Sequence, residues 1–162
     1  MEFDHAARLT DIFGEWPDFH DAEVLRVSVD RGGPGGPTMD VMIHVFERTA
    51  EVDSAGLYVL KHHTQVTLRF TNVDLEGLAW IKQQDVLEDL VVTELDPESN
   101  DGRAWRIELV PSYGLGATLQ CERAIVMHVE SFRHATQLDS RTDTASALSS
   151  EPITGPDDVA VA

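Results

Sequence analysis

The feature that most constrains the fold of this chain is a two-residue alternation of apolar and other side chains. It runs through Leu25–Val29, Met39–Val45, Val66–Phe70 and Trp105–Leu109. Successive side chains of a β-strand point to opposite faces, so this period indicates strands that bury one face. We therefore expect a protein built mainly from β-strands.

Turn-forming residues separate these strands, and helical periodicity is rare. Loops are predicted at 31–37, where Gly and Pro dominate, and at 96–102. Phe3–Phe13 has apolar residues near a 3.6-residue period and is followed by Gly14 as a C-terminal stop, which predicts a helix. A short turn is expected at 77–83. The expected strands cover 25–29, 39–45, 57–60, 66–70, 87–95, 104–110 and 117–129, and the last is long enough to bend or bulge.

Six or seven strands with no helix between them favour an antiparallel meander over a parallel α/β sheet. The expected fold class is α+β, a mostly antiparallel β-sheet with an N-terminal helix packed on one face. With 162 residues, 42% of them hydrophobic, the chain can bury one core. We predict a single α+β domain over 1–134. Small and polar residues dominate 135–162, which predicts a disordered or loosely attached acidic tail.

The chain is strongly acidic. Twelve Lys and Arg against 29 Asp and Glu give a formal net charge of −17. Such a surface repels phosphate backbones, which argues against nucleic acid as a partner, and it attracts basic proteins. Solubility alone is the simpler reason for the charge. No apolar run reaches the roughly 20 residues that span a bilayer, and the N-terminus lacks the regions of a secretory signal. A cytoplasmic protein with no membrane partner is expected.

Residues 12–24 hold the candidates for chemistry. A carboxylate beside an imidazole can tune it for proton transfer, and His20, Asp21 and Glu23 are close in sequence. Neighbouring side chains of an extended chain point apart, so only Asp21 and Glu23 would share a side. The alternative is structural: His20 bonds to backbone at the start of a strand, and Asp21 satisfies turn amides.

No metal, cofactor or catalytic nucleophile is predicted. The seven histidines include the adjacent His62 and His63 but no metal-binding spacing. His44 and His128 would line a common surface if their strands were neighbours. The single cysteine, Cys121, has the pattern of a buried structural thiol. The three tryptophans are expected to be core or sheet-edge anchors: Trp16, Trp80 and Trp105.

The segment Phe13–Val24, which contains Gly-Glu-Trp-Pro-Asp-Phe-His-Asp, resembles the N-terminal signature of the immunity protein 50 family. Thr67–Val73 and Gln83–Leu90 fit the same family, so the resemblance spans about residues 8 to 132. The family pattern has asparagine where this chain has Asp85. Members are small bacterial proteins assigned to polymorphic-toxin systems. The resemblance implies a non-enzymatic protein that neutralises a cognate toxin by direct binding.

Three functional hypotheses are open at this point. The first is a binding protein that masks a basic partner, such as a nuclease-type toxin. The second is a small enzyme or ligand-binding domain that uses the His20, Asp21 and Glu23 cluster with a strand histidine, which requires a concave pocket. The third is a self-associating scaffold or homodimer that uses an uncovered strand edge. The candidate binding residues are Glu15, Trp16, Asp18, His20, Asp21, Glu23, Asp74 and Glu76.

Overall fold

The computed structural model describes residues 3–33, 35–79 and 81–132; the predicted tail at 135–162 and Trp80 lie outside the described residues. The described residues form a mostly antiparallel β-sheet of eight strands with one short helix. The elements are α1 Ala7–Phe13, β1 Glu23–Asp30, β2 Thr38–Val52, β3 Tyr58–Thr71, β4 Asp74–Ala79, β5 Val86–Glu94, β6 Trp105–Tyr113, β7 Gly116–Cys121 and β8 Arg123–Ser131.

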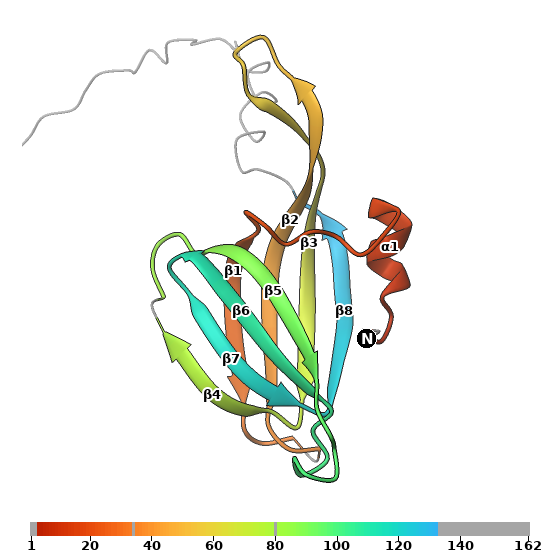
Figure 1. Cartoon of the computed structure of the whole chain (residues 1–162), viewed down its shortest axis with the longest axis vertical. Helices are drawn as coiled ribbons and strands as arrows, with labels where there is room; N and C mark the ends of the chain where they lie inside the picture. The colour runs from red at the N-terminus through yellow and green to blue at the C-terminus, as the bar shows by residue number, and fades with distance from the viewer. Residues whose placement is uncertain (1–2, 34, 80, 133–162) are drawn as a thin grey trace, which may run out of the picture.

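The sheet is folded into two layers. The strand order is β4-β7-β6-β5-β1-β2-β3-β8, and the first four strands cross in front of the last four (Figure 1). The layers join at one register pair, Glu23 with Val86. The apolar faces of both layers are buried between them. Fully buried side chains include Met39, Val41, Ile43 and Val45 of β2, Val66, Leu68 and Phe70 of β3, Leu87 of β5, Ile107 of β6 and Leu119 of β7.

The predicted meander is correct only in two runs, β1-β2-β3 and β5-β6-β7. It is wrong elsewhere, because β8 pairs with β3 and β4 pairs with β7. The described residues contain eight strands instead of six or seven, and their one helix of seven residues makes the α+β label only roughly right. The predicted strand at 117–129 is two strands, β7 and β8. They separate at Glu122, whose backbone N–H donates to the Thr71 carbonyl at 2.9 Å as the chain passes between layers.

Two other predicted elements are placed differently. The strands expected at 57–60 and 66–70 are one continuous strand, β3. The turn expected at 77–83 begins as strand, because Gly77 pairs with Thr118 in the β4–β7 ladder. The loops predicted at 31–37 and 96–102 connect β1 to β2 and β5 to β6, as expected for the residues described there.

The helix starts four residues later than predicted. Asp4 forms a bridge with Ile125, and its backbone N–H donates to the Ala124 carbonyl at 2.9 Å. This pairing with β8 holds the chain extended and excludes helix at that point. The end is as predicted: Gly14 has a positive φ of 83° and its N–H donates to the Thr10 carbonyl, a conformation that glycine adopts without strain.

The face that β1 buries also differs from the prediction. Leu25 and Val29 were expected to be buried, yet they are 37% and 46% exposed, while Val24 is only 6% exposed. A register shift between Val24 and Arg26 changes the alternation. Beyond that shift β5 diverges from β1, so the apolar side chains of β1 are only partly covered.

The hairpin of β2 and β3 continues past the rest of the sheet as a two-stranded ribbon (Figure 1). We call residues 47–61 the arm. Within the described residues β1 and β8 pair with this hairpin only below the arm. The tip is a defined turn, because the Asp53 carboxylate accepts hydrogen bonds from the backbone N–H groups of Ala55 at 2.8 Å and Leu57 at 2.9 Å.

Candidate functional site

The segment between α1 and β1 is fixed by aromatic anchors. The Trp16 ring stacks on Phe3 with centroids 4.6 Å apart, and Phe3 in turn contacts Phe70 in the core. Phe19 is 2% exposed and lies 5.8 Å from Trp16, centroid to centroid. These contacts hold residues 14–22 against the end of the sheet, so the polar side chains between the anchors have defined positions. The prediction of Trp16 as an anchor is confirmed, and Trp105 also packs against the core.

A tight turn brings His20 and Asp21 to the same side. The Asp18 carboxylate accepts a hydrogen bond from the His20 backbone N–H at 2.9 Å, and Asp21 has a positive φ of 63°. Asp tolerates this left-handed conformation better than most residues. Because the chain is not extended here, the expectation that the two side chains point apart is wrong. His20 Nε2 lies 3.8 Å from Asp21 Oδ1.

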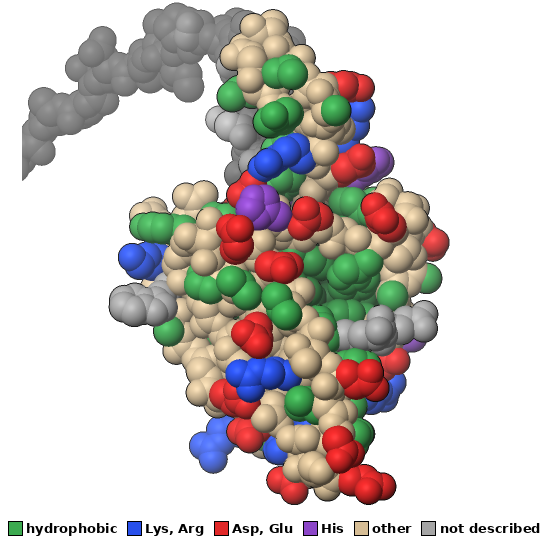
Figure 2. Space-filling model, viewed as in Figure 1, with side chains coloured by type: hydrophobic (Ala, Val, Ile, Leu, Met, Phe, Trp, Pro, Cys, Tyr) green, Lys and Arg blue, Asp and Glu red, His purple; other side chains and the backbone are tan. Residues whose placement is uncertain are grey.

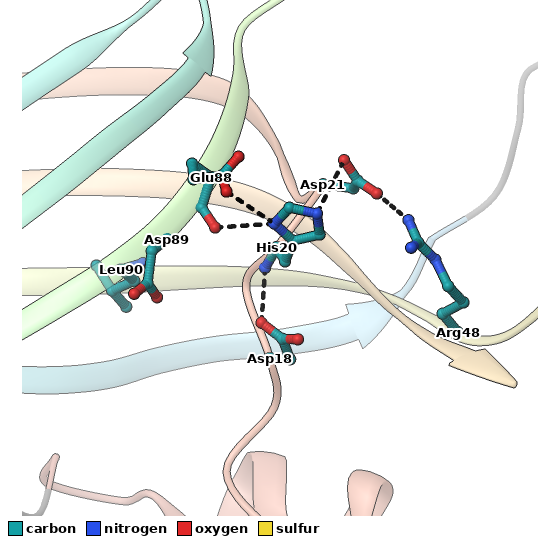
Figure 3. Close-up of polar contacts among 7 residues, drawn as sticks. All are labelled: Asp18, His20, Asp21, Arg48, Glu88, Asp89 and Leu90. Atoms are coloured by element: carbon teal, nitrogen blue, oxygen red, sulfur yellow. Dashed lines mark hydrogen bonds and ion pairs between the residues drawn. The ribbon is translucent and has the colours of Figure 1, made fainter.

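The His20 side chain forms a hydrogen bond with the backbone of β5, next to the point where β5 stops pairing with β1. Leu87 exchanges backbone hydrogen bonds with Ala22 and Asp21, and His20 Nδ1 continues the series by bonding the Glu88 carbonyl at 3.1 Å (Figure 3). A carbonyl oxygen only accepts, so Nδ1 carries the hydrogen. This hydrogen bond and the nearby Asp21 carboxylate raise the pKa of His20 above its ordinary value. The structural alternative is therefore confirmed for His20.

Asp21 has a different role from the one that the structural alternative gave it. Its carboxylate pairs with the Arg48 guanidinium at the base of the arm, and Figure 3 shows it between Arg48 and His20. Arg48 also lies over the Tyr58 ring, 5.7 Å from its centroid. Asp21 thus connects the turn before β1 to the arm, a contact between residues far apart in sequence.

A hollow of about 210 Å³ opens beside this turn. Its apolar walls come from Phe13, Trp16 and Pro17 on one side and from Phe46 on β2. Its charged and polar lining consists of Glu15, Asp18, His20, Glu47 and Arg48. The second hypothesis required a concave pocket, and this hollow lies next to His20.

The predicted binding residues fall into three separate places. Glu15, Trp16, Asp18 and His20 line the hollow, with Asp21 adjacent. Glu23 lines a different hollow of about 290 Å³, between β1 and residues 81–85. Asp74 and Glu76 are on β4. The Asp74 carboxylate lies 3.9 Å from the Arg103 guanidinium, and the Glu76 carboxylate pairs with Arg106 at 2.7 Å. The His20, Asp21 and Glu23 cluster is therefore not assembled as one site.

Sequence reasoning missed the residues that complete the hollow. Phe46, Glu47 and Arg48 come from β2. Nothing local in the sequence marks them, because they meet the 14–22 segment only through strand pairing. Arg48 was the residue of this group that the sequence could best have indicated, because basic residues are few and each one is a candidate ion-pair partner for the acidic segment. Most of the described basic residues do form ion pairs: Arg48, Lys61, Arg69, Arg103, Arg106 and Arg123.

The arm displays large apolar side chains to solvent. Val52 is 57% exposed, Leu57 is 65% exposed and Tyr58 is 59% exposed. The space-filling view shows hydrophobic side chains along the projecting ribbon (Figure 2). Clustered apolar side chains on a projection are typical of a binding surface, whereas scattered ones need no explanation.

Among the described residues, the other histidines and Cys121 do not form a metal-binding group. The strands of His44 and His128 are not neighbours, because β3 lies between β2 and β8. His44 is buried, its Nε2 lies 3.0 Å from His63 Nδ1, and its ring stacks on Phe132. Cys121 is buried, as predicted, and desolvation raises the pKa of its thiol to about 12. Among the described residues, no group of three or more His, Cys, Asp or Glu could hold a metal ion.

In residues 3–33, 35–79 and 81–132, which the structure describes, no helix has the length and apolar character needed to cross a bilayer. Comparison with known proteins finds no matching family model, no matching curated protein and no matching solved structure.

Proposed function

We propose that this chain is a non-enzymatic binding protein that neutralises a basic protein partner, in the manner of the toxin-neutralising immunity proteins that its 13–24 segment resembles. The observation that carries the proposal is the arm. A two-stranded ribbon is marginally stable in water without further strands. This one nevertheless presents Val52, Leu57 and Tyr58 to solvent, which favours a role in contacting another protein.

Charge supports a basic partner. The chain has 29 acidic residues against 12 basic ones. The described basic side chains mostly face carboxylates of the same molecule, as Arg48 faces Asp21 and Arg106 faces Glu76. The surplus carboxylates therefore dominate the field that an approaching molecule meets. Such a field accelerates encounter with a basic protein and disfavours an acidic one.

The test measures binding between the full chain and a basic toxin encoded beside its gene, by calorimetry at increasing salt. The variant Val52→Ser/Leu57→Ser/Tyr58→Ser should raise the dissociation constant more than about tenfold, since a few anchor residues, tyrosine often among them, carry most of the binding energy of an interface. Affinity should also fall as salt rises, because exposed charges are screened.

The matched control is Ile81→Ser. Ile81 is 66% exposed, like Leu57, but lies beside β1 away from the arm. This variant should bind as the wild type does. If the arm variant keeps wild-type affinity while its thermal unfolding is unchanged, the arm is not the interface and the proposal loses its main support.

A further inference from the structure

We infer that the hollow beside His20 receives the guanidinium group of an arginine side chain from the partner. This inference rests on the proposed function and names the chemistry of one contact within it. The hollow measures about 210 Å³. This is below the roughly 300 Å³ at which pockets for drug-sized ligands begin, so it suits a single side chain better than a free metabolite.

The apolar walls match the faces of a guanidinium. Phe13, Trp16 and Phe46 all line the hollow, and aromatic faces attract cations by their negative quadrupole. Arginine is planar and weakly hydrated, so it stacks on such rings more readily than lysine does. Trp16 is held in place by its stacking on Phe3, which means that the wall exists before the partner arrives.

The charges around the hollow also favour a cation. Three acidic residues line it: Glu15, Asp18 and Glu47. The Asp18 carboxylate also accepts the His20 backbone N–H, and Glu47 Oε2 lies 3.4 Å from His62 Nε2. Two lining residues oppose them, Arg48 and His20. Both lie beside Asp21, which is outside the lining: the Arg48 guanidinium is paired with it, and His20 Nε2 is 3.8 Å from its Oδ1. Carboxylates bind guanidinium groups in fixed, often bidentate geometry, so these side chains supply orientation as well as attraction.

The hollow and the arm form one continuous surface. Glu47 and Arg48 belong to both, since they line the hollow and begin the arm. A partner that contacts Leu57 and Tyr58 at the arm can therefore place a side chain in the hollow at the same time. Electrostatic contacts of this kind set register and partner choice, while the apolar anchors supply affinity.

The test is an NMR titration of the full chain with Nα-acetyl-arginine amide. The Trp16 indole N–H, assigned with Trp16→Phe, reports on the hollow. Arginine amide should shift this signal in a saturable way, the lysine analogue should bind more weakly, and the neutral isostere Nα-acetyl-citrulline amide should leave it unmoved. A shift of the same size with citrulline, or equal affinity for the lysine analogue, would overturn the assignment to a guanidinium.

Charge-neutral variants sharpen the test. Glu15→Gln/Glu47→Gln should raise the dissociation constant for arginine amide by about threefold or more, the effect expected for two exposed ion pairs. The control is Glu94→Gln/Glu98→Gln, at the opposite end of β5 and in the loop after it, which should leave the constant unchanged. If the dissociation constant for arginine amide rises by less than threefold in Glu15→Gln/Glu47→Gln, or rises equally in the control variant, the result counts against the site.

Failure here is distinguishable from failure of the proposed function. If arginine amide does not bind the hollow but the arm variant still loses the protein partner, the proposed function stands and this contact is wrong. If arginine amide binds the hollow but the arm variant keeps wild-type affinity for the protein partner, the contact stands and the function assigned to the arm is wrong.

Discussion

The two halves of the β2–β3 hairpin have very different surroundings. In the lower half β2 and β3 lie between β1 and β8 and under the second layer, and Val41 and Leu68 are 0% exposed. In the arm the same two strands pair only with each other, and Leu57 is 65% exposed. Apolar residues in a strand are therefore buried by the neighbouring strands and layers, and their alternation along the sequence does not determine whether they are buried.

Irregular pairing marks the boundary between the halves. The β2–β3 register shifts between Val45 and Glu47, at the boundary, and again between Arg48 and Val52, inside the arm. Such bulges bend and twist a strand pair, which is consistent with a ribbon that leaves the plane of the sheet. The Arg48 ion pair with Asp21 lies at this boundary and connects it to the body.

The largest expected effect comes from removing an aromatic ring from each half. Phe70→Ala should lower the free energy of unfolding by about 3–5 kcal/mol, because it leaves a cavity in a fully buried position. Tyr58→Ala should lower it by less than about 1 kcal/mol, since the ring is mostly exposed and its main contact is with Arg48. Urea unfolding measures both. Equal losses would mean that the arm contributes to the core.

The second comparison concerns two aspartates that each accept two backbone hydrogen bonds. Asp85 is 7% exposed and accepts from Leu115 at 2.8 Å and Lys82 at 3.0 Å, while Asp53 does the same at the exposed arm tip. Asp85→Ala leaves buried donors unsatisfied and should cost about 2–3 kcal/mol, whereas Asp53→Ala should cost about 0.5–1 kcal/mol. Thermal unfolding with Asp85→Asn as control should show substantial rescue, because the amide oxygen still accepts.

A third variant removes most of the arm, residues 49–59. Arg48 and Leu60 are directly paired, so an Asn-Gly turn can replace residues 49–59 as a two-residue hairpin loop. We expect the free energy of unfolding to change by less than about 1 kcal/mol, because the deleted segment buries little. Affinity for the basic partner should be lost. A large drop in stability would show that the ribbon supports the body.

The smallest expected effect is the pH dependence at the base of the arm. The pKa of His20 is raised in the folded protein by the Glu88 carbonyl and Asp21. A group whose folded pKa exceeds its unfolded value stabilises the fold below the unfolded value, and this contribution is lost as pH rises through the folded pKa. Urea midpoints of the wild type and His20→Gln should therefore differ more at pH 5.5 than at pH 8.5. A difference that grows with pH would contradict this.

Local pattern predicted local structure well. The alternation at Met39–Val45 and Val66–Phe70 identified two central strands, and Gly14 marked the end of the helix. These signals depend on a few consecutive residues and on backbone geometry, both of which are readable in a sequence. The same reasoning failed at Phe3 to Ala6, because pairing with Ile125 overrides the helical period there.

The sequence predicted the part of the candidate site that lies within one segment, but not the part that strand pairing brings together. The aromatic anchors and carboxylates of residues 13–21 were visible together in the sequence. The left-handed backbone of Asp21 and its ion pair with Arg48 were not, because they depend on which strands become neighbours. Glu23, Asp74 and Glu76 were grouped with the site by charge alone, and strand placement separates them from it.

The location of Cys121 has a practical consequence. The only sulfhydryl of the chain is buried at the end of β7, and burial raises its pKa to about 12, so thiol-directed reagents should react with it poorly in the native protein. A cysteine introduced at Ser54, on the tip of the ribbon, would then be the sole attachment point for a maleimide dye. Fluorescence anisotropy of that dye could follow docking in real time without any background label.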